Sequence, residues 1–186
     1  MKIKIENFRV VNKPDIPRFK AVTDVILEES LVIRDIKLIE LLKDSVSQLF
    51  IAMPSRKTPS GEYKDICHPT VVSCRTELER PIVEYFKYGR YSEGFKEEFK
   101  VTEVKVRKID SNNELKAVAS VVFNDKLVVH DIKLVERVSS DESYRRFEIY
   151  MPSKKINESF VEIVSIINEN LKSEIFNKII EQYKGM

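Results

Sequence analysis

The pattern of apolar and polar positions predicts a chain built mainly from strands, with one helical stretch near the end of each half. Alternating positions and one short apolar run predict four strands in the first half, at 1–11, 19–27, 31–42 and 49–53. From Ser73 onward, apolar residues recur every four positions, which is the spacing of one helix face. A proline inside a helix costs about 3 kcal/mol. Pro81 therefore predicts a kink, or two short helical pieces, near Arg80.

The second half shows the same order of elements. Three strands are predicted at 101–109, 115–123 and 127–135. The polar pair Asn124-Asp125 separates the last two and suits a tight hairpin turn. The stretch 159–183 is rich in isoleucine and predicts a long helix, with Asn168 or Ser173 as interruptions. The segment 89–100 carries two glycines and a Glu/Lys-rich end, which is typical of a linker.

Short stretches of sequence recur between the halves at a nearly constant spacing. The matching pairs are Lys20-Ala-Val and Lys116-Ala-Val, Asp35-Ile-Lys-Leu and Asp131-Ile-Lys-Leu, Met53-Pro-Ser and Met151-Pro-Ser, and Tyr85 and Tyr183. The first two pairs are 96 residues apart and the last two are 98 apart. We assign the difference to two extra residues in the loop between Glu136 and Phe147. The spacing indicates a tandem duplication, with a first domain at 1–88, a linker at 89–100 and a second domain at 101–186.

The predicted fold class is α+β. Each copy is expected to be a β-β-β-β-α unit, an antiparallel sheet with a C-terminal helix covering one face. A domain of about 90 residues buries a small share of its surface and is only marginally stable alone. Two linked copies gain stability if they share a core.

A basic loop follows the fourth predicted strand. Pro54 ends that strand, because proline cannot donate to a sheet ladder, and Arg56 and Lys57 come next. The turn 59–61 reverses the chain before an extended piece that ends at His68-Pro69. The segment is either a presented anion-binding loop or an ordinary exposed turn with two surface cations.

Two longer motifs carry a family resemblance. One reads Phe50-Ile-Ala-Met-Pro-Ser-Arg-Lys-Thr-Pro, followed by Gly61-Glu-Tyr-Lys-Asp-Ile and His68-Pro69; the other is Val-Val-His-Asp-Ile-Lys at 128–133. Both closely resemble signatures of the stage V sporulation protein G (SpoVG) family. In a single family domain the second motif precedes the first. Here it follows, which again indicates two copies.

The resemblance implies a small bacterial regulator linked to sporulation and septation that binds DNA and RNA. SpoVG-like proteins are dimers of identical chains. We therefore expect the two copies to pack as an intramolecular pseudo-dimer, in a molecule that is itself a monomer or a homodimer. The alternative is two separate domains on a linker, each pairing with another molecule.

The resemblance also implies where nucleic acid would bind. The candidate contacts are basic side chains of the two loops and the first helix: Arg56, Lys57, Lys64, Arg75, Lys154 and Lys155. The net charge is only +2, so binding requires a local basic patch rather than bulk charge. Several aromatic residues are further candidates for base stacking, although their spacing favours packing for most of them: Tyr63, Tyr85, Phe86, Tyr88 and Tyr91.

The second copy of the loop is degenerate. It keeps Met151-Pro-Ser-Lys-Lys155, but at the larger spacing Ser159, Glu162 and Ile166 stand where the first copy has Gly61, Lys64 and His68. Conversely, the second copy has His130 where the first has Arg34. We expect the first loop to contact ligand, and the second to serve partly as a scaffold.

The sequence does not favour catalytic chemistry. Cys67, His68 and Cys74 do not have a recognised zinc spacing, and His130 and Asp131 would face opposite sides of a strand. With two histidines and four glycines in the whole chain, we expect no catalytic residues, metal site or cofactor. No apolar run reaches the roughly 18–20 residues that span a bilayer. With reduced cysteines and no signal peptide, the expected location is the cytoplasm.

The competing function is a protein-interaction or scaffold module with the same fold. The near-neutral charge and the degenerate second loop motivate it. In that case the isoleucine-rich stretch 160–183 would supply a face for a protein partner.

Overall fold

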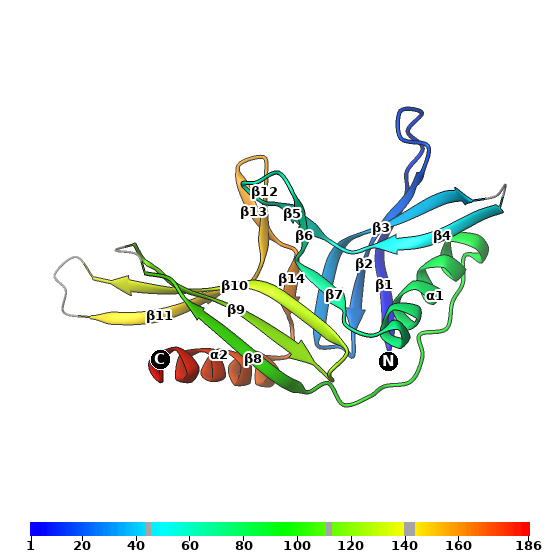
Figure 1. Ribbon diagram of the computed structural model, residues 1–186. Helices are drawn as coiled ribbons and strands as arrows, with labels where there is room; N and C mark the ends of the chain where they lie inside the picture. The colour runs from blue at the N-terminus through cyan, green and yellow to red at the C-terminus, as the bar shows by residue number, and fades with distance from the viewer. Residues whose placement is uncertain (44–45, 111–112, 140–143) are drawn as a thin grey trace.

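The computed structural model describes residues 1–43, 46–110, 113–139 and 144–186, and shows an α+β chain of two repeats (Figure 1). The first repeat contains β1 (Ile3–Val10), β2 (Phe19–Leu27), β3 (Leu31–Lys43), β4 (Val46–Ala52), β5 (Ser55–Lys57), β6 (Tyr63–Asp65), β7 (Cys67–Pro69) and α1 (Val72–Tyr88). The second contains β8 (Val101–Lys108), β9 (Leu115–Phe123), β10 (Leu127–Val138), β11 (Arg145–Tyr150), β12 (Ser153–Ile156), β13 (Ser159–Glu162), β14 (Val164–Ile166) and α2 (Glu169–Lys184). Both repeats thus have four long antiparallel strands, a small hairpin, a short strand and a helix.

The prediction of a helix over 159–183 was wrong, and so was that of two helical pieces near Pro81, while the alternative of a kink there stays a prediction. The segment 159–166 forms β13 and β14, and α2 begins only at Glu169. Asn168 caps this helix, because its side-chain oxygen accepts a hydrogen bond from the Leu171 N–H at 3.1 Å. Pro81 does not divide α1, which is assigned as one helix from Val72 to Tyr88. Pro81 is buried, so its packing helps to offset the hydrogen bond that a proline removes.

The two repeats exchange a short strand. β3 pairs with β2 on one edge, while its other edge is divided between β4, at Lys37–Lys43, and β14 of the second repeat, at Leu31–Ile33. β10 divides its edge in the same way between β11, at Lys133–Val138, and β7 of the first repeat, at Leu127–Val129. The predicted intramolecular pseudo-dimer is confirmed, as two interlocked five-stranded sheets.

A β-bulge lies where each central strand changes partner. Asp35 in β3 and Asp131 in β10 have positive φ values of 64° and 62°, which aspartate tolerates better than most residues. The register with the neighbouring strand shifts at both places. The Asp35 N–H is satisfied by the side chain of Asp24 at 3.1 Å. The bulge interrupts the alternation of side chains, and this decides which residues face the other repeat.

Each helix packs on the long strands of its own repeat, and three buried residues of one helix are equivalent to three of the other. They are Cys74, Leu78 and Ile82 in α1, and Leu171, Ile175 and Ile179 in α2. Each pair is 97 residues apart, so Tyr183 corresponds to Phe86 and not, as predicted, to Tyr85. The spacing falls from 98 to 97 within the small hairpins. The equivalent pairs Lys57–Tyr63 and Lys155–Phe160 enclose turns that differ in length by one residue, the second being shorter. The insertion assigned to the β10–β11 loop lies partly in 140–143, outside the described residues.

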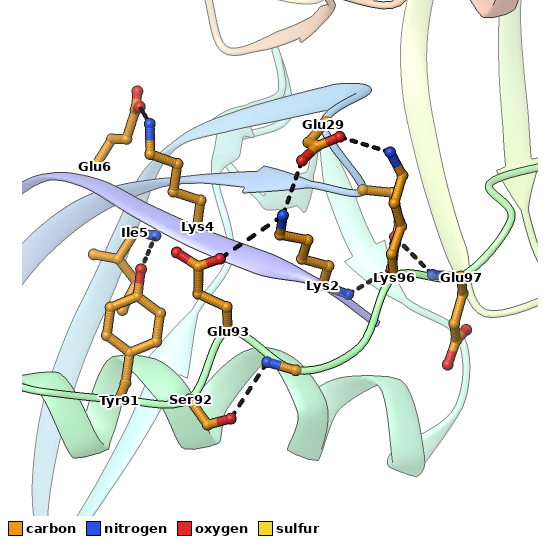
Figure 2. Close-up of polar contacts among 12 residues, drawn as sticks. Lys2, Lys4, Ile5, Glu6, Glu29, Tyr91, Ser92, Glu93, Lys96 and Glu97 are labelled. Carbon is orange, nitrogen blue, oxygen red and sulfur yellow. Dashed lines mark hydrogen bonds and ion pairs between the residues drawn. The ribbon is translucent and has the colours of Figure 1, made fainter.

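The segment between α1 and β8 follows the outer edge of β1 (Figure 2). The Ile3 N–H donates to the carbonyl of Glu93 at 2.7 Å, and the Ile5 N–H donates to the Tyr91 hydroxyl at 2.9 Å. These contacts satisfy donors on a strand edge that would otherwise be open to pairing. The segment is therefore an ordered part of the first sheet's edge.

This segment is also held at the turn between β2 and β3 and at the equivalent turn between β9 and β10. The buried Glu28 carboxylate accepts hydrogen bonds from the N–H groups of Lys2 at 2.6 Å and Glu97 at 2.9 Å. At the equivalent turn, the Asn124 side chain accepts from the Lys100 N–H at 2.7 Å. The connection is thus anchored to both repeats, which fixes their relative placement together with the exchanged strands.

Candidate nucleic-acid interface

The basic loops predicted from the sequence are two small hairpins, β5–β6 and β12–β13, which lie close together between the two sheets (Figure 1). Residues directly opposite in an antiparallel pair share a face. In the first hairpin Arg56 therefore shares one face with Lys64, and Lys57 shares the other with Tyr63. In the second hairpin the corresponding pairs are Lys154 with Val161 and Lys155 with Phe160.

The hairpin faces that carry Arg56 and Lys154 contact the opposite repeat. Arg56 donates from Nε and Nη2 to the carboxylate of Asp131, with 3.0 Å between Nη2 and Oδ1. Lys154 donates to Oδ2 of Asp35 at 2.6 Å. The bond to Asp131 raises the pKa of Arg56, so the guanidinium is charged at any physiological pH. We call these two cross-repeat ion pairs the clamps.

Sequence reasoning missed the aspartates of the clamps. The sequence contains one signal, because Asp35-Ile-Lys-Leu and Asp131-Ile-Lys-Leu repeat an acidic residue inside an otherwise apolar strand. The partner is not readable from the sequence, since Arg56 and Asp131 are 75 residues apart.

A cavity of about 380 Å³ lies beside the first clamp and is lined by Arg56, Lys64, Asp65, His68, His130 and Asp131. The His68 and His130 rings are tilted by 30°, with centroids 5.2 Å apart. Burial lowers the pKa of His130, and the nearby His68 lowers it further. The expectation that His130 and Asp131 face opposite sides of a strand was wrong, because the bulge at Asp131 brings both to this cavity.

The equivalent position beside the second clamp holds a guanidinium. Arg34 donates from Nη1 to the carbonyl of Glu162 at 3.1 Å and to the hydroxyl of Ser165. Ser165 is the structural equivalent of His68, because it pairs with β3 as His68 pairs with β10. Likewise Val161 corresponds to Lys64. The equivalences predicted from the sequence, Ile166 and Glu162, are off by one residue.

The remaining candidate cations are divided between exposed and structural positions. Lys57, Lys64 and Lys155 are exposed. Arg75 lies on α1 and donates to the carbonyl of Ile51 in β4 at 3.1 Å. Glu79, one turn later, accepts from the Ile51 N–H at 3.0 Å. Arg75 therefore has a structural role at a strand edge and is not part of either hairpin.

The aromatic candidates separate in the same way. Tyr85 packs edge-on against Phe8, with ring centroids 4.9 Å apart, and against Tyr91 at 5.6 Å. Tyr63 is 73% exposed, and so is Phe160, which sequence reasoning had placed in a helix. The hairpins thus carry exposed rings as well as exposed lysines.

Both cysteines are buried free thiols. Burial raises the pKa of Cys74 to about 11 and raises that of Cys67 as well, so neither forms a thiolate at neutral pH. The part of the chain that the structure describes contains no group of three or more His, Cys, Asp or Glu placed to hold a metal ion. Across the same residues, neither helix has the length and apolar character needed to cross a membrane.

Comparisons with known proteins match both halves of the chain. The SpoVG family model matches residues 1–88 and 99–185. A protein of Caldanaerobacter subterraneus subsp. tengcongensis named "Putative septation protein SpoVG" is 42% identical over 95 residues, 51% of this chain and 100% of that protein. A protein of Desulforudis audaxviator with the same name is 34% identical over 86 residues, 46% of this chain and 93% of its own length. Each relative matches a stretch about the size of one repeat.

Proposed function

Because this chain belongs to the SpoVG family and carries the family domain twice, we propose that it is a non-catalytic regulator that binds DNA or RNA through its two hairpins. The relatives are named for septation. We extend that link to this chain, as a cytoplasmic protein acting on septation through bound nucleic acid. The predicted link to sporulation belongs to the same proposal.

The observation that carries the proposal is the pair of equivalent exposed lysines on the hairpins. Lys57 and Lys155 occupy matching positions opposite Tyr63 and Phe160. Arg56 and Lys154 are engaged in the clamps, so their role is to orient the hairpins. Lys64, exposed beside the histidine cavity, adds a third available cation. Cations of this kind contact phosphates and support binding with modest sequence preference.

Fluorescence anisotropy with duplex DNA and with single-stranded RNA, at low and physiological salt, tests the proposal. The informative variant is Lys57→Glu/Lys155→Glu, which reverses the two exposed charges and leaves both clamps intact. We expect the wild type to bind more weakly as salt rises, because neutralised phosphates release counterions. We expect the variant to lose at least about tenfold in affinity, since two attractive contacts become repulsive.

A matched control reverses two exposed cations away from the hairpins, Lys13→Glu/Arg90→Glu. This control has the same net charge as the test variant, and we expect it to bind nearly as the wild type does. Equal losses in the two variants would show that bulk charge, not the hairpins, attracts the polymer. Absence of binding to both polymers would overturn the proposed function.

A protein-interaction module remains the second candidate, favoured by the apolar surface of the second hairpin. Ile156 is 51% exposed and Val161 is 37% exposed. The partner face predicted at 160–183 is different, because Ile175 and Ile179 are fully buried in the core. A complex with a protein partner that resists salt, with no binding of nucleic acid, would support this alternative.

A further inference from the structure

Each hairpin presents an aromatic ring beside a lysine on its outward face. Tyr63 in β6 lies directly opposite Lys57, and Phe160 in β13 lies directly opposite Lys155. Both rings are 73% exposed. The two hairpins differ in turn length and in most other side chains, yet the ring and the lysine occupy the same register in both.

Keeping an aromatic ring largely in water gives up most of the free energy that its burial would contribute. A ring next to an ammonium group offers a flat apolar surface for a nucleobase and a positive charge for the adjoining phosphate. Bases inside a duplex are already stacked on their neighbours. A ring on the face of a short hairpin can stack only on bases that are unpaired.

We propose that Tyr63 and Phe160 are stacking platforms for unpaired bases, so that the ligand of the hairpins is single-stranded nucleic acid. This inference rests on the proposed function and names the class of polymer for the same surface. Lys57 and Lys155 contact the phosphates that flank the stacked bases.

The low net charge of the hairpins agrees with binding in which base stacking supplies more of the free energy than phosphate contacts do. Carboxylates on the same hairpins offset much of the basic charge: Glu62, Asp65, Glu158 and Glu162. Two phosphate contacts to a single strand, from Lys57 and Lys155, predict a slope of about −1.4 for log K against log salt concentration, and a third from Lys64 would bring it to about −2. A steep slope, near −5 or beyond, would require many phosphate contacts and would contradict this proposal.

Tryptophan fluorescence gives a direct measurement, because the chain contains no tryptophan. We would make the single variants Tyr63→Trp and Phe160→Trp, with Phe95→Trp as the matched control, since Phe95 is 90% exposed in the connecting segment. The probes are oligodeoxythymidylate, oligouridylate and an abasic strand of equal length. Stacking on a base quenches the two hairpin tryptophans and leaves the control unchanged. The abasic strand, which has phosphates but no bases, quenches none of them.

Affinity provides the second readout. Tyr63→Ala/Phe160→Ala should weaken binding of the single strands by at least about 30-fold, if each ring stacks on one base. Tyr63→Phe/Phe160→Tyr keeps both rings and should bind within a factor of about two. Both substitutions are at exposed positions, so circular dichroism should show unchanged folding.

The outcomes separate the two proposals. Binding of duplex DNA that equals or exceeds binding of single strands, with no effect of the alanine variant, overturns the stacking proposal and leaves the proposed function standing. Equal binding of the abasic strand also overturns stacking alone. No binding of any polymer overturns both, and the exposed rings would then belong to a surface for protein or for a second copy.

Discussion

We call each clamp, together with the bulge and the side chains around it, a clamp region. The two clamp regions have the same backbone arrangement, but the side chains beside the ion pairs differ. Each has an aspartate at positive φ in a β-bulge, an ion pair from the opposite repeat's hairpin, and an exchanged strand beside it. In the first, the histidines and Lys64 line a cavity. In the second, Arg34 occupies the equivalent position with Ser165. The parts that hold the repeats together are thus kept in both copies, while the side chains around them have diverged.

The features common to both regions are the ones that hold this fold together. The bulge and the ion pair fix the hairpins at the point where the central strand changes partner. The space beside each clamp can be filled or left open without altering that backbone arrangement.

Two equivalent substitutions, each of which leaves a cavity beside one helix, test whether the repeats unfold as one unit. Ile82→Ala in α1 and Ile179→Ala in α2 each remove a fully buried side chain, and each should cost about 2–5 kcal/mol. Because the exchanged strands interlock the sheets, either variant should lower one shared unfolding transition, measured by urea denaturation. Two transitions, with each variant shifting a different one, would show that the repeats unfold separately.

Replacing each clamp aspartate by asparagine compares how much the two ion pairs contribute to the free energy of unfolding. Asp131→Asn should cost about 1–2 kcal/mol, because Arg56 makes two bonds to that carboxylate. Asp35→Asn should cost about half as much, since Lys154 makes one. Asparagine tolerates positive φ, so the bulge itself should persist.

A mutant cycle isolates the first clamp. In an Arg56→Ala background, Asp131→Asn should have little further effect on the urea midpoint. An undiminished cost in that background would assign the effect to the bulge and not to the ion pair.

The helix starts also differ, and the difference can be reversed. Asn168 caps α2, whereas Val71, at the equivalent position of α1, provides no side-chain cap. Asn168→Ala should cost about 1 kcal/mol, and Val71→Asn should gain about 0.5 kcal/mol in thermal or urea unfolding. Val71 is 40% exposed, so little packing is lost. A loss of stability on Val71→Asn would show that its apolar contacts outweigh the missing cap.

The smallest expected effect is a dependence of stability on pH that only the first clamp region should show. The pKa of His130 is lowered in the folded protein, so the unfolded chain takes up the proton more readily. Stability should therefore fall as the pH drops from about 7 through 6.5, the ordinary histidine value, toward the folded pKa. The charged and titratable side chains that line the same cavity are Arg56, Lys64, Asp65, His68 and Asp131.

Converting the first region into the second should abolish this dependence. The double variant His130→Arg/His68→Ser copies Arg34 and Ser165. Its urea midpoint should not vary between pH 7 and 5.5, while that of the wild type decreases. Carboxylates such as Glu29, whose pKa two lysines lower to about 2, act only at lower pH. An unchanged slope in the variant would place the titrating group elsewhere.

Much of the fold was predictable from the sequence. Strand alternation predicted β2 and β9 at their observed bounds, and the repeated stretches predicted two equivalent halves. The basic hairpins were located through their cations, and the family was identified from two motifs, one in each half. These features depend on local patterns or on direct comparison of letters, both of which a sequence carries.

The tertiary structure decided how those parts are used. β7 and β14 have three residues each, too few to show a period, and their partners lie in the other repeat. Ile163 and Ile166 were included in a predicted helix. Their apolar character predicted that they are buried, but it did not show whether they lie in a strand or in a helix. Arg56 was predicted as a cation that contacts nucleic acid, and only the strand exchange brings it to Asp131. A sequence pattern reports which side chains avoid water, whereas the long-range pairing of strands determines what they contact.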